Sequence, residues 1–183
     1  PEGDRLRVLV RVPLEAMRDV DFPLRDGTFL DLATARPSLE TAAQLWVAGG
    51  LSMYENDRRL PDPRLAHVRV ALPSERTFFS YDTALAGVSG PPLDPSTEVP
   101  WTQAMLDVLL EYPISSEHAE LSVRPEFARL GLQVSTSVRF LPPGGAVRAF
   151  EYSGDPGLVR LDPRWHQAAF TFVKLGFLHI LGG

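Results

Sequence analysis

The C-terminal end of the chain restricts the possible folds more than any other segment. From Ala168 to Leu181 the only charged residue is Lys174, and apolar side chains fall on every face of a helical wheel. A helix on the surface of a soluble protein shows a single apolar stripe instead. Asp162-Pro163 precedes the run and is a typical helix start, with Asp as the N-cap and Pro at the first helical position. We therefore predict an apolar helix at 163–183 that must be surrounded by other apolar groups on all sides.

Two environments could surround this helix: the core of the protein itself, or lipid together with other transmembrane helices. A membrane span needs about 20 apolar residues, and the run from 168 to 181 is shorter. If the natural chain continues, we expect an interfacial or membrane-entering helix. Its interface residues are then Trp165, Lys174 and Phe177, because tryptophan favours the headgroup level and lysine can extend its ammonium group toward water. The periodicity leaves both environments open.

The first half of the chain mixes strand and helix patterns. From Arg5 to Val12 apolar residues occupy every second position, with only Leu9 out of phase, which predicts a half-buried strand. The following segments predict a helix over about 38–54 with Ser38 as a possible N-cap, a strand at 67–72 and a second helix over about 75–87. The proline-rich segment 89–100 is expected to be an extended loop.

The second half indicates β structure. Four segments rich in Val, Leu, Phe and Tyr predict strands at 105–114, 119–123, 131–141 and 146–152. Pro142-Pro143-Gly144-Gly145 is typical of a turn, so the last two strands should form a hairpin. The fold class that we expect is mainly β: an antiparallel β-sandwich, Ig-like or a partly open barrel, with two accessory helices and a C-terminal apolar helix. Residues 1–162 then form one β-rich domain, and residues 163–183 form the apolar helix.

Composition excludes several classes of function. The net charge is −5 and the basic residues are scattered along the sequence, unlike the clustered basic surface that binds nucleic acid. The chain has no cysteine, which excludes disulfides, thiolate metal sites and cysteine nucleophiles. Ser115, Ser116 and His118 lie close together, but no Gly-x-Ser-x-Gly motif accompanies them, so a solvated turn is favoured over a nucleophile. We expect no enzymatic activity.

Three further groups of residues are candidate sites, each with a simpler structural explanation. The four histidines (His67, His118, His166 and His179) lack the spacing of metal ligands. The acidic residues Asp19, Asp21, Asp26 and Asp31 lack the order of a calcium-binding loop. The tryptophans Trp46, Trp101 and Trp165 could form an aromatic platform, although a tryptophan in a β-sandwich more often belongs to the core.

Four segments of the second half resemble the HupE/UreJ-like family of membrane proteins. They are Leu110 to Ile114, Phe140 to Gly144, Leu161 to Ala169 and Gly176 to Gly182, and the last two are the most specific. The resemblance implies a bacterial inner-membrane protein with a signal peptide, an extracytoplasmic domain facing the periplasm or cell exterior, and a bundle of transmembrane helices. Residues 1–162 would be that domain, and residues 163–183 the start of the first membrane helix.

The resemblance also implies a metal. In the nickel-permease branch of the family, the first membrane helix carries a histidine, five further residues and then Asp-His. His179 matches the first histidine of this motif, and the Asp-His pair would fall beyond Gly183. Imidazole is a common ligand of nickel and related divalent ions. We therefore expect no cofactor within these residues and a divalent metal such as nickel in the full-length protein, while a structural role for His179 at a helix end remains open.

Two functions follow from the sequence. The first is an extracytoplasmic accessory domain of a HupE/UreJ-like membrane protein, linked to divalent-metal uptake, with the membrane, its own transmembrane helices and a protein partner as contacts. The second is a self-contained soluble β-sandwich that binds a small ligand or a protein, with the C-terminal helix packed on its own core. The all-round apolar character of 168–181 motivates the first, and family resemblance by itself does not establish function.

Overall fold

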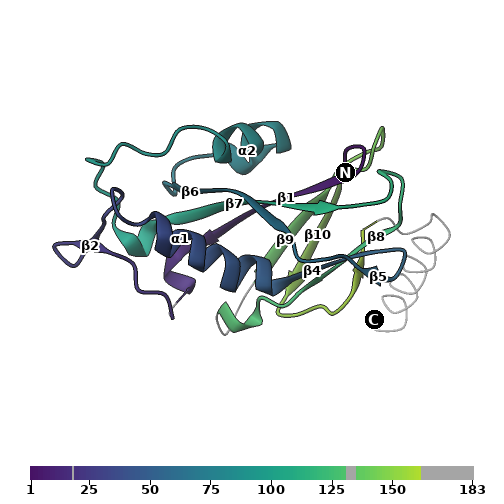
Figure 1. Ribbon diagram of the computed structural model, residues 1–183, viewed down its shortest axis with the longest axis horizontal. Coiled ribbons are helices and arrows are strands. Elements are labelled where there is room, and N and C mark those ends of the chain that lie inside the picture. The colour runs from purple at the N-terminus through teal and green to yellow at the C-terminus, as the bar shows by residue number, and fades with distance from the viewer. Residues whose placement is uncertain (18, 131–134, 162–183) are drawn as a thin grey trace, which may run out of the picture.

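The computed structural model describes residues 1–17, 19–130 and 135–161, and the predicted C-terminal helix at 163–183 lies outside them. The described chain is mainly β, with antiparallel strand pairs throughout and two α-helices (Figure 1). The prediction of a mainly β chain with antiparallel strands and two helices is therefore confirmed.

A three-stranded sheet forms the centre of the described molecule. It contains β1 (Arg5–Pro13), β7 (Met105–Pro113) and β6 (Arg64–Ala71) in the order β1-β7-β6. All three strands coincide closely with segments in which the sequence alternates or is rich in β-forming residues. Both pairings are antiparallel and β7 lies between the other two, so strands from both halves of the sequence share one sheet.

The two faces of the three-stranded sheet differ in chemistry. One face presents apolar side chains such as Val8, Leu110 and Leu65, which are cross-strand neighbours and belong to the main core or pack against it. The other face presents charged residues and is covered by α2 (Tyr81–Val88), which contacts all three strands. Leu9, the residue out of phase in the sequence, pairs with Leu109 on this second face. Its position is therefore explained by the helix that covers it.

A second sheet has four strands in the order β11-β8-β4-β5. They are β11 (Val159–Arg160), β8 (Leu121–Pro125), β4 (Leu51–Glu55) and β5 (Arg58–Arg59). The two-residue loop Asn56-Asp57 joins β4 to β5, with φ of 49° and 64°, as a type I′ turn requires. The sequence analysis predicted only β8 of these four strands. β5 and β11 have two residues each, too few to show a periodic pattern, and β4 falls at the end of a predicted helix.

Two hairpins complete the β structure. The predicted hairpin is confirmed: β9 (Ser135–Phe140) pairs with β10 (Arg148–Ser153), with Phe140 opposite Arg148. The other hairpin, β2 (Leu24–Arg25) with β3 (Phe29–Leu30), was not predicted and lies in the Asp-rich stretch. It projects at one end of the molecule, far from β5 and β8 (Figure 1).

The first helix is shorter than predicted. The α-helix α1 spans Arg36–Ala42 and continues as a π-helical turn η2 (Ala43–Val47) and a 3₁₀ turn η3 (Ala48–Gly50). The chain then becomes strand β4, so the prediction of helix up to residue 54 was wrong. The reason is tertiary: Leu51–Glu55 pairs with β8 over its whole length, and sheet pairing overrides a local helical pattern. Ser38 is not the N-cap, since its hydroxyl donates to the carbonyl of Asp21.

The second helix begins later than predicted. The 3₁₀ turn η4 (Thr77–Phe79) precedes α2, and the N-cap of α2 is Ser80. The Ser80 hydroxyl accepts a hydrogen bond from the backbone N–H of Thr83, and the Thr83 hydroxyl accepts one from the Ser80 N–H. This reciprocal capping box satisfies two N–H groups at the start of the helix, which sets its first turn.

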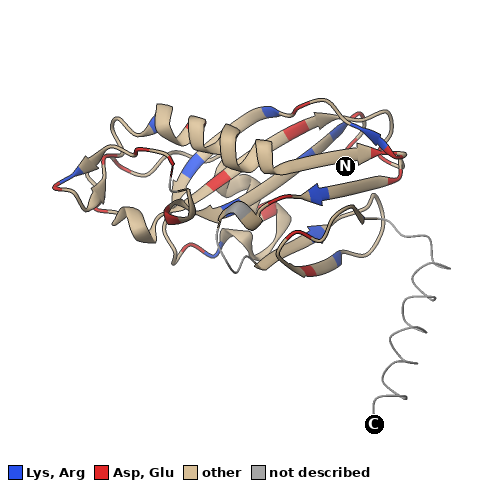
Figure 2. Ribbon diagram, turned by 90° about the horizontal axis from the view of Figure 1, so that it is seen from below, with Lys and Arg blue, Asp and Glu red and all other residues tan. Residues whose placement is uncertain are grey.

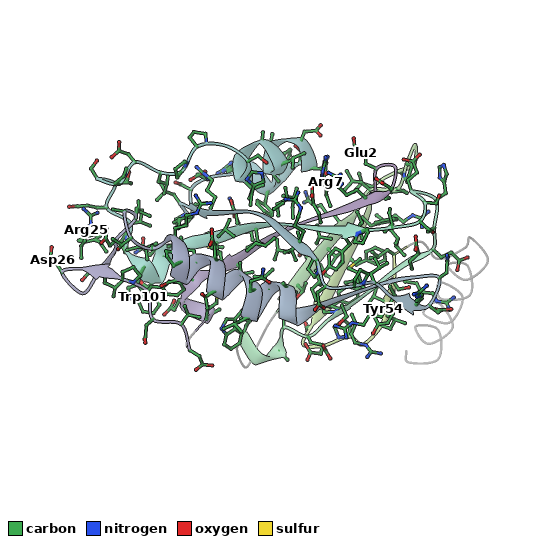
Figure 3. All side chains as sticks on the ribbon, in the orientation of Figure 1. Glu2, Arg7, Arg25, Asp26, Tyr54 and Trp101 are labelled. Carbon is green, nitrogen blue, oxygen red and sulfur yellow. The ribbon has the colours of Figure 1, made fainter. Side chains whose placement is uncertain are left out.

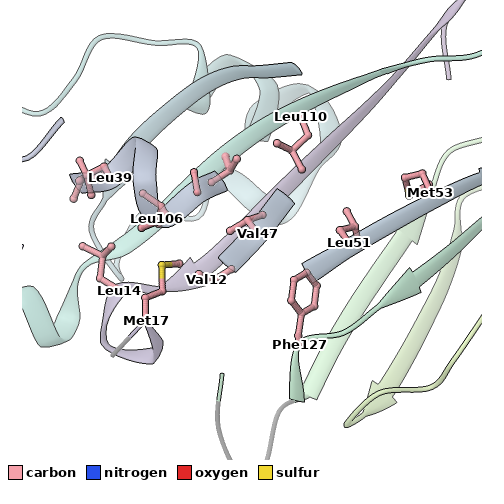
Figure 4. Packing of buried hydrophobic residues seen from close by; sticks show 14 of the residues in the cluster. Val12, Leu14, Met17, Leu39, Val47, Leu51, Met53, Leu106, Leu110 and Phe127 are labelled. Carbon is pink, nitrogen blue, oxygen red and sulfur yellow. The ribbon is translucent and has the colours of Figure 1, made fainter. Parts of the chain in front are cut away.

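The hydrophobic core joins the apolar face of the three-stranded sheet to α1, η2 and the four-stranded sheet (Figure 4). Short 3₁₀ turns border it at η1 (Leu14–Ala16), η5 (Trp101–Gln103) and η6 (Ala128–Leu130). The completely buried side chains include Leu14, Leu30, Val47, Leu106 and Leu110. Tyr112 is also buried, and its hydroxyl donates to the carbonyl of Leu51 at 3.2 Å, so its polar atom is satisfied.

Candidate functional site

The candidate sites named from the sequence fall partly outside the described residues, and those within them are not brought together into a site. Trp165, Lys174, Phe177 and His179, together with His166, lie outside the described residues. Within 1–17, 19–130 and 135–161, no group of three or more His, Asp or Glu side chains is arranged to hold a metal ion. The acidic stretch instead serves local structure, since Asp31 accepts hydrogen bonds from the Thr34 hydroxyl and the Ala33 amide.

The serine and histidine residues near position 116 form a turn. The Ser115 hydroxyl donates to the carboxylate of Glu55 at 2.9 Å, and the His118 backbone amide donates to the Ser116 hydroxyl at 3.1 Å. The His118 imidazole lies 3.6 Å from Glu117. None of these contacts joins a serine hydroxyl to the imidazole, so these residues do not have the geometry of an activated nucleophile. Trp46 and Trp101 pack against the core.

A ladder of charged residues lies under α2 on the charged face of the three-stranded sheet. In its first row, Asp107 of β7 lies between Arg11 of β1 and Arg69 of β6. Asp107 is fully buried, and Arg11 binds both of its carboxylate oxygens, at 2.6 and 2.7 Å. Arg11 also donates to Thr77 and to the carbonyl of Glu75. This row ties β1 and β7 to the segment that leads into α2.

The second row of the ladder is centred on Glu111 of β7. Its carboxylate receives hydrogen bonds from Arg7 of β1 and Arg64 of β6, and Arg5 lies 3.7 Å away. Burial by itself would raise the pKa of Glu111, but the three arginines outweigh it and hold the pKa below its ordinary value. Every arginine of the ladder has a carboxylate partner, so we assign the ladder a structural role. Figure 2 shows acidic and basic residues interspersed along the ribbon.

The ladder predicts that stability falls in acid. Burial tends to raise the pKa of Glu75, but Arg69, the Leu72 amide and Arg11 lower it below the ordinary value of 4.5, and Glu111 is shifted in the same direction. A carboxyl with a lowered folded pKa contributes stability above its unfolded pKa and loses it as the pH falls through the folded value. Thermal unfolding scans from about pH 6 to pH 3 should show the melting temperature falling below about pH 4.5. The melting temperature of the Glu111→Gln variant should fall less steeply with pH than that of the parent. An equal slope would contradict the assignment of the acid sensitivity to Glu111.

The outer face of the four-stranded sheet carries a second group of arginines, which is not predicted from the sequence. Arg160 of β11 lies opposite Ser122 of β8, Ser122 lies opposite Tyr54 of β4, and Tyr54 lies opposite Arg59 of β5. Directly opposite residues point to the same face of a sheet, so this row crosses all four strands. The guanidinium of Arg124 lies 5.8 Å from the centroid of the Tyr54 ring. We call Arg59, Arg124 and Arg160 around Tyr54 the arginine face.

The three arginines of the arginine face are exposed in the described chain and only partly neutralised, whereas Ser122 in the same row is buried and Tyr54 is partly exposed. The side chains of Arg59 and Arg160 are 63% and 52% exposed, in contrast to the nearly buried Arg11 of the ladder. Asp62 lies 3.8 Å from Arg59, and Asp57 lies 3.8 Å from Arg160, both beyond normal hydrogen-bonding distance. Each guanidinium has five N–H donors, so donors remain for another anionic partner. The arginine side chains point outward because the opposite face of the sheet is buried: Leu121, Val123 and Met53 belong to the core.

The arginine face lies at the end of the described molecule from which the chain leads to the C-terminal segment. Arg160 is the last residue of β11, and Leu161, which follows, is buried in the core. Tyr54 lies at this end, whereas Arg25 and Asp26 of the projecting hairpin lie at the other (Figure 3). A signal for this face was present in the sequence only as the alternation of Ser122 and Arg124 with apolar residues.

A groove of about 880 Å³ lies along β6. Five successive residues of β6, from Leu65 to Arg69, line it, together with α1, η2, the end of α2 and the residues after it. Successive strand residues point to opposite faces, so a groove that touches all five runs along the strand edge. β6 is an outer strand of its sheet, and among the described strands only β7 pairs with it. The groove therefore follows an open strand edge.

Within the described ranges, no helix combines the length and apolarity needed to cross a bilayer. Comparisons of the chain with protein-family models, with curated proteins and with solved structures found no match.

Proposed function

We propose that residues 1–162 form an extracytoplasmic accessory domain, an antiparallel β-sandwich, of a HupE/UreJ-like bacterial inner-membrane protein. In this proposal residues 163–183 begin the membrane-embedded part, with Trp165, Lys174 and Phe177 at the interface. The observation that carries the proposal is the all-round apolar segment 168–181, which follows β11 after a few residues. Lipid or other membrane helices would cover such a segment.

The described part of the chain supports the proposal because it has a hydrophobic core of its own. Its core draws on both larger sheets and on α1, from Leu6 at the start to Leu161 at the end. The charged ladder fastens α2 to the three-stranded sheet at Arg11 and Asp107. A core built from the described residues supports the proposal that 163–183 belongs to the membrane part.

The proposed role is not catalytic. The contacts of Ser115 and His118 are those of a turn, and the described carboxylates of the ladder are paired with arginines. A metal role would belong to the membrane part, where His179 would be one ligand of a divalent ion such as nickel and further ligands would come from the rest of the protein. The domain itself would contact the membrane surface and a protein partner.

A second candidate function is supported by the groove along β6. The chain could be a self-contained soluble β-sandwich that binds the extended segment of a partner protein, with 163–183 packed on its own core. The open edge of β6 would supply backbone hydrogen bonds to an added strand, and Leu65, Val68 and Val88 would supply apolar contacts.

Truncation separates the two functions. Under the membrane proposal, a chain ending at residue 162 should keep its free energy of unfolding to within about 1 kcal/mol, the scale of a change outside the core. It should also stop sedimenting with phosphatidylcholine vesicles, which the chain with 163–183 should bind. Urea unfolding followed by circular dichroism measures the first quantity, and vesicle cosedimentation measures the second.

The opposite result would favour the soluble alternative. If 163–183 packs on the domain, its removal should cost several kcal/mol, because several large apolar side chains would lose their contacts. The longer chain should then stay in the supernatant without detergent. The membrane proposal would be refuted if the truncated chain is strongly destabilised, or if the longer chain does not bind vesicles.

A further inference from the structure

The arginine face and the point where the chain leaves the domain occupy the same place in the fold. Arg160 is both a member of the face and the last residue of β11. The row from Arg160 to Arg59 crosses four neighbouring strands, which lie about 4.8 Å apart, so it is roughly 14 Å wide. The face is thus a broad surface attached directly to the chain exit.

Chain length limits how far this face can lie from a membrane. Trp165 follows Arg160 by five positions in the sequence, and a fully extended chain spans at most about 3.6 Å per residue. If Trp165 lies at the headgroup level, as the proposed function requires, the Cα atom of Arg160 lies within about 18 Å of that level. The proposed function therefore keeps the arginine face near the bilayer surface.

The chemistry of the face matches lipid headgroups. A guanidinium presents planar paired N–H donors that suit phosphate oxygens, and it is less strongly hydrated than an ammonium group. Tyr54, in the middle of the face, has an apolar ring and a polar hydroxyl, a combination that favours the membrane interface. Asp62 and Asp57 lie 3.8 Å from Arg59 and Arg160, and Glu120 and Glu126 flank Ser122 and Arg124 along β8. In the described chain these carboxylates leave guanidinium N–H donors of the face without a hydrogen-bonded acceptor, so the donors can bind anionic headgroups.

We infer that the arginine face is a docking surface for the phosphate groups of anionic phospholipids, which orients the domain on the membrane. This inference rests on the proposed function, because it requires the chain to enter the bilayer after Leu161. Segment 163–183 attaches the domain, and Arg59, Arg124 and Arg160 determine which side of it faces the lipid. In this arrangement the projecting β2–β3 hairpin, at the opposite end of the molecule, stays accessible to partners (Figure 1).

Vesicle cosedimentation of the complete 183-residue chain tests the inference. The parent is compared with the triple variant Arg59→Gln, Arg124→Gln, Arg160→Gln on vesicles of phosphatidylcholine alone and with phosphatidylglycerol added. The parent should bind the anionic vesicles more tightly, and the triple variant should lose about tenfold to a hundredfold of that preference, because each basic residue near an anionic surface contributes about fivefold. Binding to neutral vesicles should be unchanged. The preference should also weaken as salt is raised.

Two matched variants serve as controls. Arg36→Gln, Arg76→Gln, Arg139→Gln removes the same charge from exposed positions on other elements and should keep the anionic preference. The variant Arg59→Lys, Arg124→Lys, Arg160→Lys retains the charge and should keep most of the preference for anionic vesicles. Circular dichroism melts should be similar for all variants, since exposed ion pairs contribute little to stability.

The outcomes distinguish this inference from the proposed function. Failure of the parent to bind either kind of vesicle refutes the proposed function and the inference that depends on it. The inference alone is refuted if the parent binds neutral vesicles normally and the Arg59, Arg124, Arg160 glutamine variant keeps the preference for anionic vesicles. It is also refuted if this variant and the Arg36, Arg76, Arg139 glutamine variant lose that preference equally. Inorganic phosphate that displaces the parent from anionic vesicles better than chloride does at equal ionic strength would indicate a free-anion site and would also refute it.

Discussion

Replacement of Asp107 by asparagine should lower the free energy of unfolding by about 3–5 kcal/mol, the cost of breaking a buried ion pair by removing one partner. Asp107 is fully buried, and both of its oxygens accept hydrogen bonds from Arg11, whose side chain is only 14% exposed. The neutral amide would leave the Arg11 guanidinium without its counter-charge at a site that water hardly reaches. Urea unfolding of parent and variant measures the difference.

A double variant provides the control for this prediction. Arg11→Met with Asp107→Leu removes both charges together and should recover most of the lost stability, because a buried pair can be replaced by apolar residues at little cost. At the exposed pair Arg36–Glu40, which has a distance of 2.9 Å, Glu40→Gln should change stability by only about 0.5 kcal/mol. An effect of Asp107→Asn as small as that of Glu40→Gln would show that Asp107 is not an anchor of the sheet.

Truncation of Leu110 to alanine should lower the free energy of unfolding by about 2–5 kcal/mol. Leu110 is completely buried in the middle of β7, with Val8 and Leu65 as its cross-strand neighbours. The strands on both sides hold the backbone, so the surroundings can collapse only partly into the space that the side chain leaves. The expected cost is therefore that of lost apolar contacts and of a remaining cavity.

Leu158→Ala is the matched control for the core prediction. Leu158 is 40% exposed and lies outside the regular strands, so its truncation should cost less than about 1 kcal/mol. Urea unfolding with equal slopes for parent and variants would show that the change is one of stability and not of the unfolded state. A cost for Leu110→Ala no larger than that for Leu158→Ala would contradict the placement of Leu110 in the core.

The parts of the fold that the sequence predicted are those with a strong local pattern. β1 and β7 coincide with runs of apolar or alternating residues, and the β9–β10 hairpin coincides with two such runs around Pro142-Pro143-Gly144-Gly145. A strand whose two faces meet different surroundings must alternate in polarity, and a tight turn needs particular residues. Both requirements concern neighbours in the chain, so they can be recognised without knowing what lies across the sheet.

The arginine face could not be predicted in this way. Arg59, Arg124 and Arg160 are far apart in the sequence and come from three different strands, two of them only two residues long. Only the order β11-β8-β4-β5 places them together. The charged ladder is similar, because Arg11, Asp107 and Arg69 become neighbours through the pairing of β7 with β1 and β6.

The sequence by itself thus determined the mainly β character, the confirmed hairpin and the approximate positions of two helices, as well as the apolar character of 168–181. The tertiary structure decided that Leu51–Glu55 is a strand. It also decided which of the arginines are buried against carboxylates and which remain exposed to solvent. The physical reason is the separation along the chain over which each interaction acts. Alternation and turn chemistry act between near neighbours, whereas strand order and register bring together residues that the chain itself keeps apart.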